Sequence, residues 1–301
     1  MKNIISEIRK HKIGDYIEEV PLSKYTTYKV GGIASLIVYP NSVDKLITLI
    51  KVLRENKLEY KVLGNGSNVI FSDKPYDGVI IKLDSFDDLK IDNTVITVGA
   101  GYNLMKLAYK MSKMGLSGLE FAAGIPGSIG GAIYMNAGAY KSDMGYITSS
   151  IKVLTEDLEV KEIYNRDLDF HYRSSLLQRN PNLICIEATL VLKRAIVQDI
   201  LTLIEDRKQK RLMSQPLEYP SAGSVFRNPS DDFAGRLIEE AGLKGKMIGG
   251  AIVSPKHANF IVNYNNATAQ DIKDLITDVK TTVKDKYNVD LLVEQEFVNW
   301  E

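Results

Sequence analysis

Glycine density in one segment constrains the fold of this chain more than any other feature. Residues 118–140 read GLEFAAGIPGSIGGAIYMNAGAY and contain six of the 22 glycines. Because glycine costs about 1 kcal/mol in the interior of a helix or strand, we expect neither element to run through this segment. Glycine also lets backbone N–H groups approach a ligand closely, and its backbone adopts positive φ at little cost. The segment therefore predicts either a loop that cradles a phosphate or flat cofactor, or a crossover packed tightly between two sheets.

Length and charge balance limit the classes of protein to consider. A chain of 301 residues is long enough for about two domains and a sizeable core. Lysine and arginine together number 38, as do aspartate and glutamate, so the formal net charge is +0. No overall field attracts the protein to nucleic acid or a membrane surface, and an anionic ligand needs a local site.

The chain carries no recognisable targeting segment or metal motif. Its first 19 residues interleave charges with apolar residues, unlike a signal peptide, and no run of about 18 apolar residues occurs. We therefore expect a cytoplasmic protein without membrane insertion. Cys185 lies in the apolar run LICIEATLVL and is expected to be a small core residue. The three histidines, at 11, 171 and 257, are too scattered to predict a metal site.

Hydrophobic spacing and capping residues predict helices that alternate with strands, so the fold class is α/β or α+β. Asn41 is the expected N-cap of the first of these helices, and Thr268 with Asp271 forms a capping box before the last. A charged helix at 197–212 leads into a final unit of about 90 residues. The expected helices lie at 41–53, 104–115, 197–212, 237–242 and 268–283. The expected strands lie at 61–64, 69–71, 78–83, 94–99, 151–154, 160–164, 183–192 and 260–263.

A second glycine-containing turn, Gly64 to Asn68, follows a strand and reads GNGSN. Exposed N–H groups in such a loop could bind pyrophosphate. A dinucleotide fingerprint fails here because position 69 is valine, and the match that starts at Gly99 fails at Leu104. Hairpin chemistry and ligand contact both remain open for this turn.

Five motifs in the chain resemble the UDP-N-acetylenolpyruvoylglucosamine reductase family, over about Leu22 to Glu294. They are TTYKVGG at 26–32, GNGSN at 64–68, the glycine-rich segment at 118–140, FHYRSS at 170–175 and SAGSVFRNP at 221–229. The resemblance implies a mixed α+β fold, with a two-lobed FAD-binding part of the vanillyl-alcohol-oxidase type and a C-terminal α+β substrate-binding domain. The implied divisions are 1–80, 81–195 and 196–301. Only 51 positions separate Arg173 from Ser224, as in the shorter subclass of the family.

The resemblance also implies an activity and a cofactor site. The expected enzyme is an oxidoreductase acting on a CH–CH group, which uses non-covalent FAD and NADPH to reduce UDP-N-acetylenolpyruvoylglucosamine to UDP-N-acetylmuramate. This reaction serves peptidoglycan synthesis, and with it cell wall biogenesis, cell shape and cell division; the enzyme is expected to be a monomer. The implied cofactor contacts are Gly64, Asn65, Gly66, Ser67 and Asn68 at the pyrophosphate, and Gly124, Ile125, Pro126, Gly127, Ser128, Gly130, Gly131, Asn136, Ala137 and Gly138 along the flavin and adenosine.

Two catalytic residues are implied by the resemblance, although each has an ordinary structural interpretation. Arg173 could be a surface cation that covers an apolar patch, but in the family it contacts the substrate carboxylate. Ser224 could be a turn residue, but in the family it is the proton donor. Tyr172, Arg227 and Asn228 are expected to bind substrate, the latter two at its diphosphate and sugar.

The third catalytic residue is a C-terminal glutamate. The family position falls on Glu294, but Glu294 and Glu296 would face the same side of a strand, so the pattern alone leaves both open. The basic cluster at 207–211 is expected to be a solvated helix face. For His257 and Asn259, substrate contact and a structural role both remain open. Alternative functions are another FAD oxidoreductase of the same fold and a non-catalytic nucleotide-binding relative.

Overall fold

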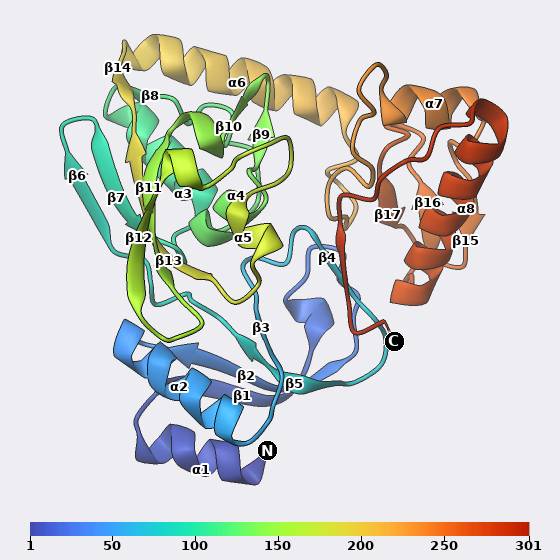
Figure 1. Ribbon diagram of the computed structural model, residues 1–301. Helices are drawn as coiled ribbons and strands as arrows, with labels where there is room; N and C mark the ends of the chain where they lie inside the picture. Colours follow the sequence, from blue (N-terminus) through green and yellow to red (C-terminus); the bar gives the residue numbers. More distant parts are fainter. Residues whose placement is uncertain (301) are drawn as a thin grey trace. The chain divides into compact units, whose positions relative to one another are not determined.

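Among residues 1–300, five helices lie close to where spacing and capping residues predict them, and three others were not predicted. The computed structural model describes residues 1–300, and its α-helices are α1 Lys2–Lys10, α2 Val43–Glu55, α3 Leu104–Lys113, α4 Ile129–Tyr134, α5 Leu176–Arg179, α6 Val197–Ser214, α7 Ala234–Glu240 and α8 Ala269–Tyr287 (Figure 1). Ser42, rather than the expected Asn41, caps α2 by accepting a hydrogen bond from the Lys45 N–H. The capping box of Thr268 and Asp271 at α8 is confirmed.

The strands of residues 1–300 form a four-stranded sheet that contains a parallel pair, a five-stranded antiparallel sheet, a three-stranded antiparallel sheet and three two-stranded pairs. Their bounds are β1 Gly14–Pro21, β2 Ile33–Pro40, β3 Tyr60–Val62, β4 Val69–Phe71, β5 Tyr76–Ile81, β6 Leu89–Asp92, β7 Val95–Gly99, β8 Leu116–Ser117, β9 Gly138–Ala139, β10 Ser142–Asp143, β11 Thr148–Leu154, β12 Val160–Tyr164, β13 Ile184–Val191, β14 Lys193–Arg194, β15 Met247–Ile248, β16 Ala251–Val253, β17 Ile261–Asn263 and β18 Glu296–Val298. Three short 3₁₀ helices are η1 Leu22–Lys24, η2 Met144–Tyr146 and η3 Asn165–Asp167. The mixed α+β class is confirmed.

The chain divides into two compact units. Unit 1 contains residues 1–18, 35–65 and 77–208. Its core packs α2, α3 and α4 against strands of a four-stranded sheet, ordered β1-β2-β5-β3, and an antiparallel sheet, ordered β12-β11-β13-β7-β6. Cys185 is buried on β13, as expected, and burial raises the pKa of its thiol to about 12. The three-part division expected from the sequence stays a prediction.

Unit 2 contains residues 19–34 and 66–76 together with the chain from Gln209 onward. The sheet β15-β16-β17 packs with α7 and α8, and β18 pairs parallel with β4. The TTYKVGG motif belongs to this core, because Tyr28 is fully buried and donates its hydroxyl to Gln295 Oε1 at 3.2 Å. Burial raises the pKa of that phenol, since the charged form would be desolvated.

A helix does pass through the glycine-rich segment, so the expectation of none is wrong over α4. Gly130 lies in this helix, and a Cβ added to it would lie 3.1 Å from the Cβ of Ala100. The Gly130 N–H also donates to the Ala100 carbonyl at 2.8 Å. Close backbone packing on Ala100 therefore outweighs the low helix propensity of glycine.

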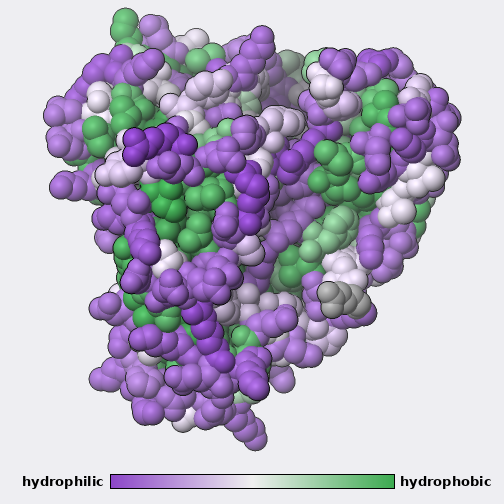
Figure 2. Space-filling view, in the orientation of Figure 1, coloured by the Kyte–Doolittle hydropathy of each residue, from purple (hydrophilic) through white to green (hydrophobic). Residues whose placement is uncertain are grey.

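Helix α6 shows the solvated character expected of the charged helix. Among its residues only Ile200 and Ile204 are buried, and Lys208 and Lys210 of the basic cluster are exposed. Hydrophilic residues also dominate the face of the molecule seen in Figure 2. Within residues 1–300, no helix combines the length and the apolar character that crossing a membrane requires.

Gly66 and Gly242 differ in the space around the backbone, so alanine substitutions at the two positions test how tightly unit 2 packs there. Both have positive φ, but a Cβ on Gly66 would lie 2.0 Å from the Tyr25 carbonyl oxygen, whereas a Cβ on Gly242 meets nothing within 4 Å. We expect Gly242→Ala to cost only the left-handed penalty of about 1 kcal/mol, and Gly66→Ala to cost about 2 kcal/mol more. Urea unfolding of the cofactor-free protein measures both. Equal losses in the two variants would show that the close approach at Gly66 relaxes freely.

Candidate functional site

Two parts of unit 1 that are predicted to contact the cofactor, Gly64 and the start of α4, lie against each other. A Cβ added to Gly64 would lie 2.6 Å from Ser128 Oγ, and this serine caps α4 by accepting from the Gly131 N–H. A Cβ on Gly127 would meet nothing within 4 Å, and one on Gly131 would meet only Ser128 Oγ, at 3.4 Å. No neighbouring atom therefore requires glycine at Gly127. The open side of this loop fits a flat cofactor that approaches the backbone.

Lys82 is a charged residue beside these loops that the sequence analysis missed. Its side chain is only 8% exposed, and Nζ donates to the Gly64 carbonyl at 2.5 Å and lies 3.2 Å from Asp84 Oδ1. The ammonium therefore holds the start of the GNGSN turn and places a positive charge next to it. The sequence offers no signal for this role, because Lys82 simply follows an apolar strand, and only the fold brings it to Gly64.

Other predicted cofactor residues have structural reasons for their identity. A Cβ on Gly138 would lie 2.5 Å from the Cβ of Asp143, in the tight pair of β9 and β10. The buried Asn136 donates from Nδ2 to the His171 carbonyl and accepts from the Gly145 N–H, both at 2.9 Å. Both polar atoms of the Asn136 side chain are therefore used within unit 1. Cofactor contact through these residues stays a prediction.

Arg173 lies in a tight turn of unit 1. His171 and Ser174 exchange two backbone hydrogen bonds, at 3.0 and 3.1 Å, and Arg173 has a φ of 55°. Its Nη2 donates to the Gly138 carbonyl at 2.8 Å, and its guanidinium carbon lies 5.0 Å from the centre of the exposed Tyr172 ring. The arginine is thus half-buried and oriented, rather than a mobile surface cation.

In unit 2 the backbone brings Ser224 close to Glu294. The Glu294 N–H donates to the Val225 carbonyl at 2.8 Å, and Phe226 forms an antiparallel bridge with Val293. These contacts join the segment after Ser224 to the C-terminal segment. The two residues, 70 positions apart in the sequence, are therefore neighbours in the fold.

Glu294 and Glu296 do not share a strand. Strand β18 begins at Glu296, and a bend at the buried Gln295 separates Glu296 from Glu294. The Glu296 N–H donates to the Asn68 carbonyl at 2.9 Å, so Glu296 follows β4, whereas Glu294 pairs with the Ser224 segment. This register favours Glu294 as the residue near Ser224.

Asn259 holds the Ser224 segment in place. Its Oδ1 accepts from the Phe226 N–H at 2.9 Å, its Nδ2 donates to the Phe226 carbonyl at 2.8 Å, and its own carbonyl accepts from the Val225 N–H. His257 Nδ1 in turn accepts from the Asn259 N–H at 3.2 Å. Of the two open roles for these residues, the structural one is observed.

Arg227 leaves one buried donor unsatisfied. Among the described residues, its Nε is buried without a hydrogen-bond partner. An unpaired buried donor is costly, so a guanidinium N–H of this kind suits an anionic ligand. Asn228 differs, because its Oδ1 accepts from the Ala234 N–H at 3.1 Å at the start of α7.

Two different parts of the chain match two different family models. Residues 34–163 match the FAD binding domain model, and residues 215–298 match the model of the C-terminal domain of UDP-N-acetylenolpyruvoylglucosamine reductase. Curated UDP-N-acetylenolpyruvoylglucosamine reductases from Bacillus velezensis and Bacillus subtilis are 46% and 44% identical over 299 residues, which is 99% of this chain and of each relative.

A solved structure supports the same relationship. The UDP-N-acetylenolpyruvylglucosamine reductase of Thermus caldophilus matches with a TM-score of 0.80 and 34% identity, over 94% of this chain and 98% of the other. Alkyldihydroxyacetonephosphate synthase matches at 16% identity with a TM-score of 0.50, over 64% of this chain and 44% of the other, which indicates a shared fold only. The FAD-binding part is thus of the vanillyl-alcohol-oxidase type.

His257 should make the stability of unit 2 depend on pH. Burial and the nearby Lys244 lower the pKa of His257, with a smaller opposing effect from Glu239. The unfolded chain therefore binds more protons than the folded one below a pH of about 6.5, so stability is complete above that pH and falls as the pH drops below it. Urea unfolding between pH 8 and pH 5 should show this loss.

His257→Gln should flatten that part of the profile, because the titrating imidazole is gone. Lys244→Met should reduce the loss, because it removes a cation that opposes protonation of His257. A profile that stays the same in both variants would assign the pH dependence to other groups.

Proposed function

The chain belongs to the UDP-N-acetylenolpyruvoylglucosamine reductase family, and we propose that it reduces UDP-N-acetylenolpyruvoylglucosamine to UDP-N-acetylmuramate with NADPH as the electron donor. The observation that supports this most directly is the backbone pairing of Glu294 with Val225, next to Ser224. It joins two residues that the family resemblance assigns to catalysis from segments far apart in the sequence.

The residues of unit 1 fit a non-covalent FAD. When bound, FAD would take hydride from NADPH and deliver it to C3 of the enolpyruvyl group. Gly127 and Gly131 offer the open backbone face, and Gly64 and Asn65 begin the turn for the pyrophosphate, with Lys82 fixing the Gly64 carbonyl. The ammonium of Lys82 would lessen the cost of holding two phosphate charges near this turn.

Ser224 would supply the proton that completes the reduction. Hydride addition at C3 leaves an electron pair at C2 that is delocalised into the carboxylate, and this carbanion-like centre is basic enough to take a proton from a hydroxyl. Ser224 Oγ would donate its proton to C2, which forms the new C–H bond and leaves the oxygen to recover a proton from solvent. Gly223 beside it has a φ of +75° and open space around its Cβ position, which leaves room for the substrate.

Arg173 and Glu294 would stabilise the negative charge on the substrate. A guanidinium keeps its charge at any physiological pH and can bind a carboxylate with two parallel hydrogen bonds. We propose that Arg173 binds the enolpyruvyl carboxylate. The Glu294 carboxyl, in its protonated form, would donate a hydrogen bond to the same substrate carboxylate. Tyr172 would border the substrate, and Arg227 would donate its unpaired Nε–H to the diphosphate, with Asn228 near the sugar.

The product would enter peptidoglycan precursor synthesis, and through it cell wall biogenesis, cell shape and cell division. UDP-sugars and NADPH are cytoplasmic metabolites, so we propose a cytoplasmic enzyme that acts as a monomer on small molecules alone. Purified protein should be yellow and should oxidise NADPH only when the enolpyruvyl substrate is present. Oxidation with a different acceptor, or a colourless protein that binds nucleotide without turnover, would support the two alternative functions instead.

Gly127→Ala should weaken FAD binding without weakening the protein itself. The added methyl group meets no protein atom within 4 Å, so the melting temperature of the cofactor-free protein should stay the same. A cofactor lying on this backbone would lose close contact, and we expect FAD affinity to fall by about tenfold or more. Quenching of flavin fluorescence measures the affinity. Unchanged affinity would move the cofactor away from this loop.

Ser224→Ala should separate the two half-reactions. Flavin reduction by NADPH needs no proton from Ser224 and should stay nearly intact, whereas reoxidation by the enolpyruvyl substrate should slow by about 10²-fold or more. Stopped-flow absorbance of the flavin follows each half-reaction. An equal loss in both would exclude the proton-donor role.

The two neighbouring glutamates provide a matched pair for the same assay. Glu294→Ala should slow reoxidation by about 10²-fold, because it removes the proposed hydrogen-bond donor. Glu296→Ala, in the strand that pairs with β4, should leave reoxidation unchanged. The reverse result would assign the catalytic carboxylate to Glu296.

A further inference from the structure

The turn that carries Arg173 has a strained backbone. With a φ of 55°, Arg173 occupies the second central position of the turn between His171 and Ser174, where glycine or asparagine is preferred. Asp169, at the start of the same loop, also has a positive φ, of 46°. Such residues persist only where the surroundings determine the backbone strongly. The contacts around residues 169–174, here called the Arg173 loop, should therefore explain why arginine tolerates this conformation.

Contacts from the interior of unit 1 anchor the Arg173 loop at its middle and its end. Asn136 Nδ2 donates to the His171 carbonyl at 2.9 Å. Just after the loop, the fully buried Ser175 donates from Oγ to the Tyr134 carbonyl at 2.8 Å, and the Leu176 N–H donates to the Leu168 carbonyl at 2.8 Å. These bonds close the loop at its base, but they leave Asp169 and Ser174 to be fixed from the other side.

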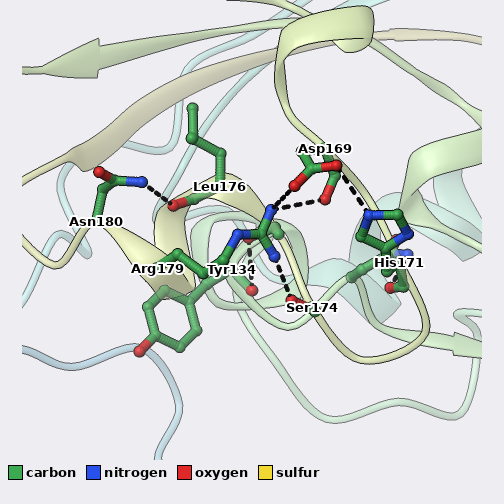
Figure 3. Close-up of polar contacts among 9 residues, drawn as sticks. Tyr134, Asp169, His171, Ser174, Leu176, Arg179 and Asn180 are labelled. Carbon is green, nitrogen blue, oxygen red and sulfur yellow. Dashed lines mark hydrogen bonds and ion pairs between the residues drawn. The ribbon is translucent and has the colours of Figure 1, made fainter.

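Arg179, at the end of α5, joins those two residues (Figure 3). Its Nη1 donates to Ser174 Oγ at 2.5 Å, and its Nη2 donates to the Asp169 carbonyl at 2.9 Å and to Asp169 Oδ2. Asp169 Oδ1 lies 2.8 Å from His171 Nε2. One guanidinium therefore spans the Arg173 loop and contacts the residue that directly follows Arg173.

Stability alone does not account for this arrangement. The side chains of Arg179 and Asp169 are 40% and 55% exposed, and ion pairs with that much exposure contribute little to folding. The geometry is nevertheless specific, because a planar fork with several N–H donors reaches three acceptors at once. A lysine at this position could not make all three hydrogen bonds.

We propose that Arg179 is a positioning residue that fixes the Arg173 loop, so that the Arg173 guanidinium, held by the Gly138 carbonyl at 2.8 Å, meets the substrate carboxylate. The inference rests on the proposed function of Arg173. It adds to that function a residue that never contacts the substrate and acts only through the turn.

The test compares Arg179→Met and Arg179→Lys with the wild-type holoenzyme in both half-reactions. We expect the KM for the enolpyruvyl substrate to rise about tenfold and flavin reoxidation to slow, because misplacement of a binding group by a fraction of an ångström weakens catalysis. Flavin reduction by NADPH and FAD affinity should stay unchanged, and the melting temperature should fall by no more than a few degrees. Arg166→Met is the matched control. Arg166 lies shortly before the Arg173 loop, its side chain is 84% exposed, and within residues 1–300 its one ion pair is with the neighbouring Asp167.

The lysine variant separates geometry from charge. Recovery of wild-type kinetics in Arg179→Lys would mean that a positive charge suffices, and would overturn the positioning role. A loss close to that of Arg179→Met supports it. If Arg179→Met does not fold, Ser174→Ala removes one of the three acceptors and should give a smaller loss in the same half-reaction.

A double-mutant cycle decides whether Arg179 acts through Arg173. In an Arg173→Ala background, Arg179→Met should cause no further loss in the substrate half-reaction, because the group it positions is absent. The same fold-loss in both backgrounds would overturn the inference. If Arg173→Ala alone leaves that half-reaction intact, the proposed role of Arg173 fails, and the inference fails with it for a recognisably different reason.

Discussion

Buried side-chain amides hold the loops on which the candidate chemistry depends. These loops lack full sheet partners, so their backbone N–H and C=O groups need other hydrogen bonds. Asn136 serves the Arg173 turn and η2 in unit 1, while Asn259 and Gln295 serve the Ser224 segment in unit 2. Each amide is almost fully buried and uses both its donor and its acceptor. An aspartate would lack the donor, and a leucine would lack both the donor and the acceptor.

Rigid loops of this kind allow the backbone to store strain where binding groups must be oriented. Arg173 keeps a left-handed conformation because its own guanidinium is bonded to the Gly138 carbonyl, and the next residue, Ser174, is bonded to Arg179. In unit 2, Gly223 reaches a similar conformation without that cost and leaves the space around it open. Catalytic groups held in advance lose little free energy to reorganisation when the substrate binds, which is the main advantage of a preorganised site.

The sequence predicted those parts of the fold that depend on local patterns. The strand at Val160–Tyr164 follows from its strand-forming residues, and the capping box at Thr268 follows from capping chemistry. Neither needs knowledge of distant residues. Helix α4 was missed because its Gly130 is required by contact with Ala100, about 30 positions away. Lys82 and Arg179 were missed for the same reason, since their roles exist only once the chain has folded. The catalytic candidates came from resemblance to a family rather than from spacing.

The glycines of the glycine-rich segment have different surroundings, so tight packing explains some of them, and a loop that holds the cofactor stays a prediction for others. Gly130 and Gly138 are required by protein atoms, at distances where any Cβ would press on a neighbour. Gly127 has open space instead, and Gly131 meets only a serine hydroxyl. Close protein contacts thus explain Gly130 in the helix and Gly138 in the hairpin, whereas the backbone at Gly127 faces open space. A flat cofactor should therefore approach this chain along Gly127 to Gly131, and Gly138 should contribute by setting the hairpin whose carbonyl orients Arg173.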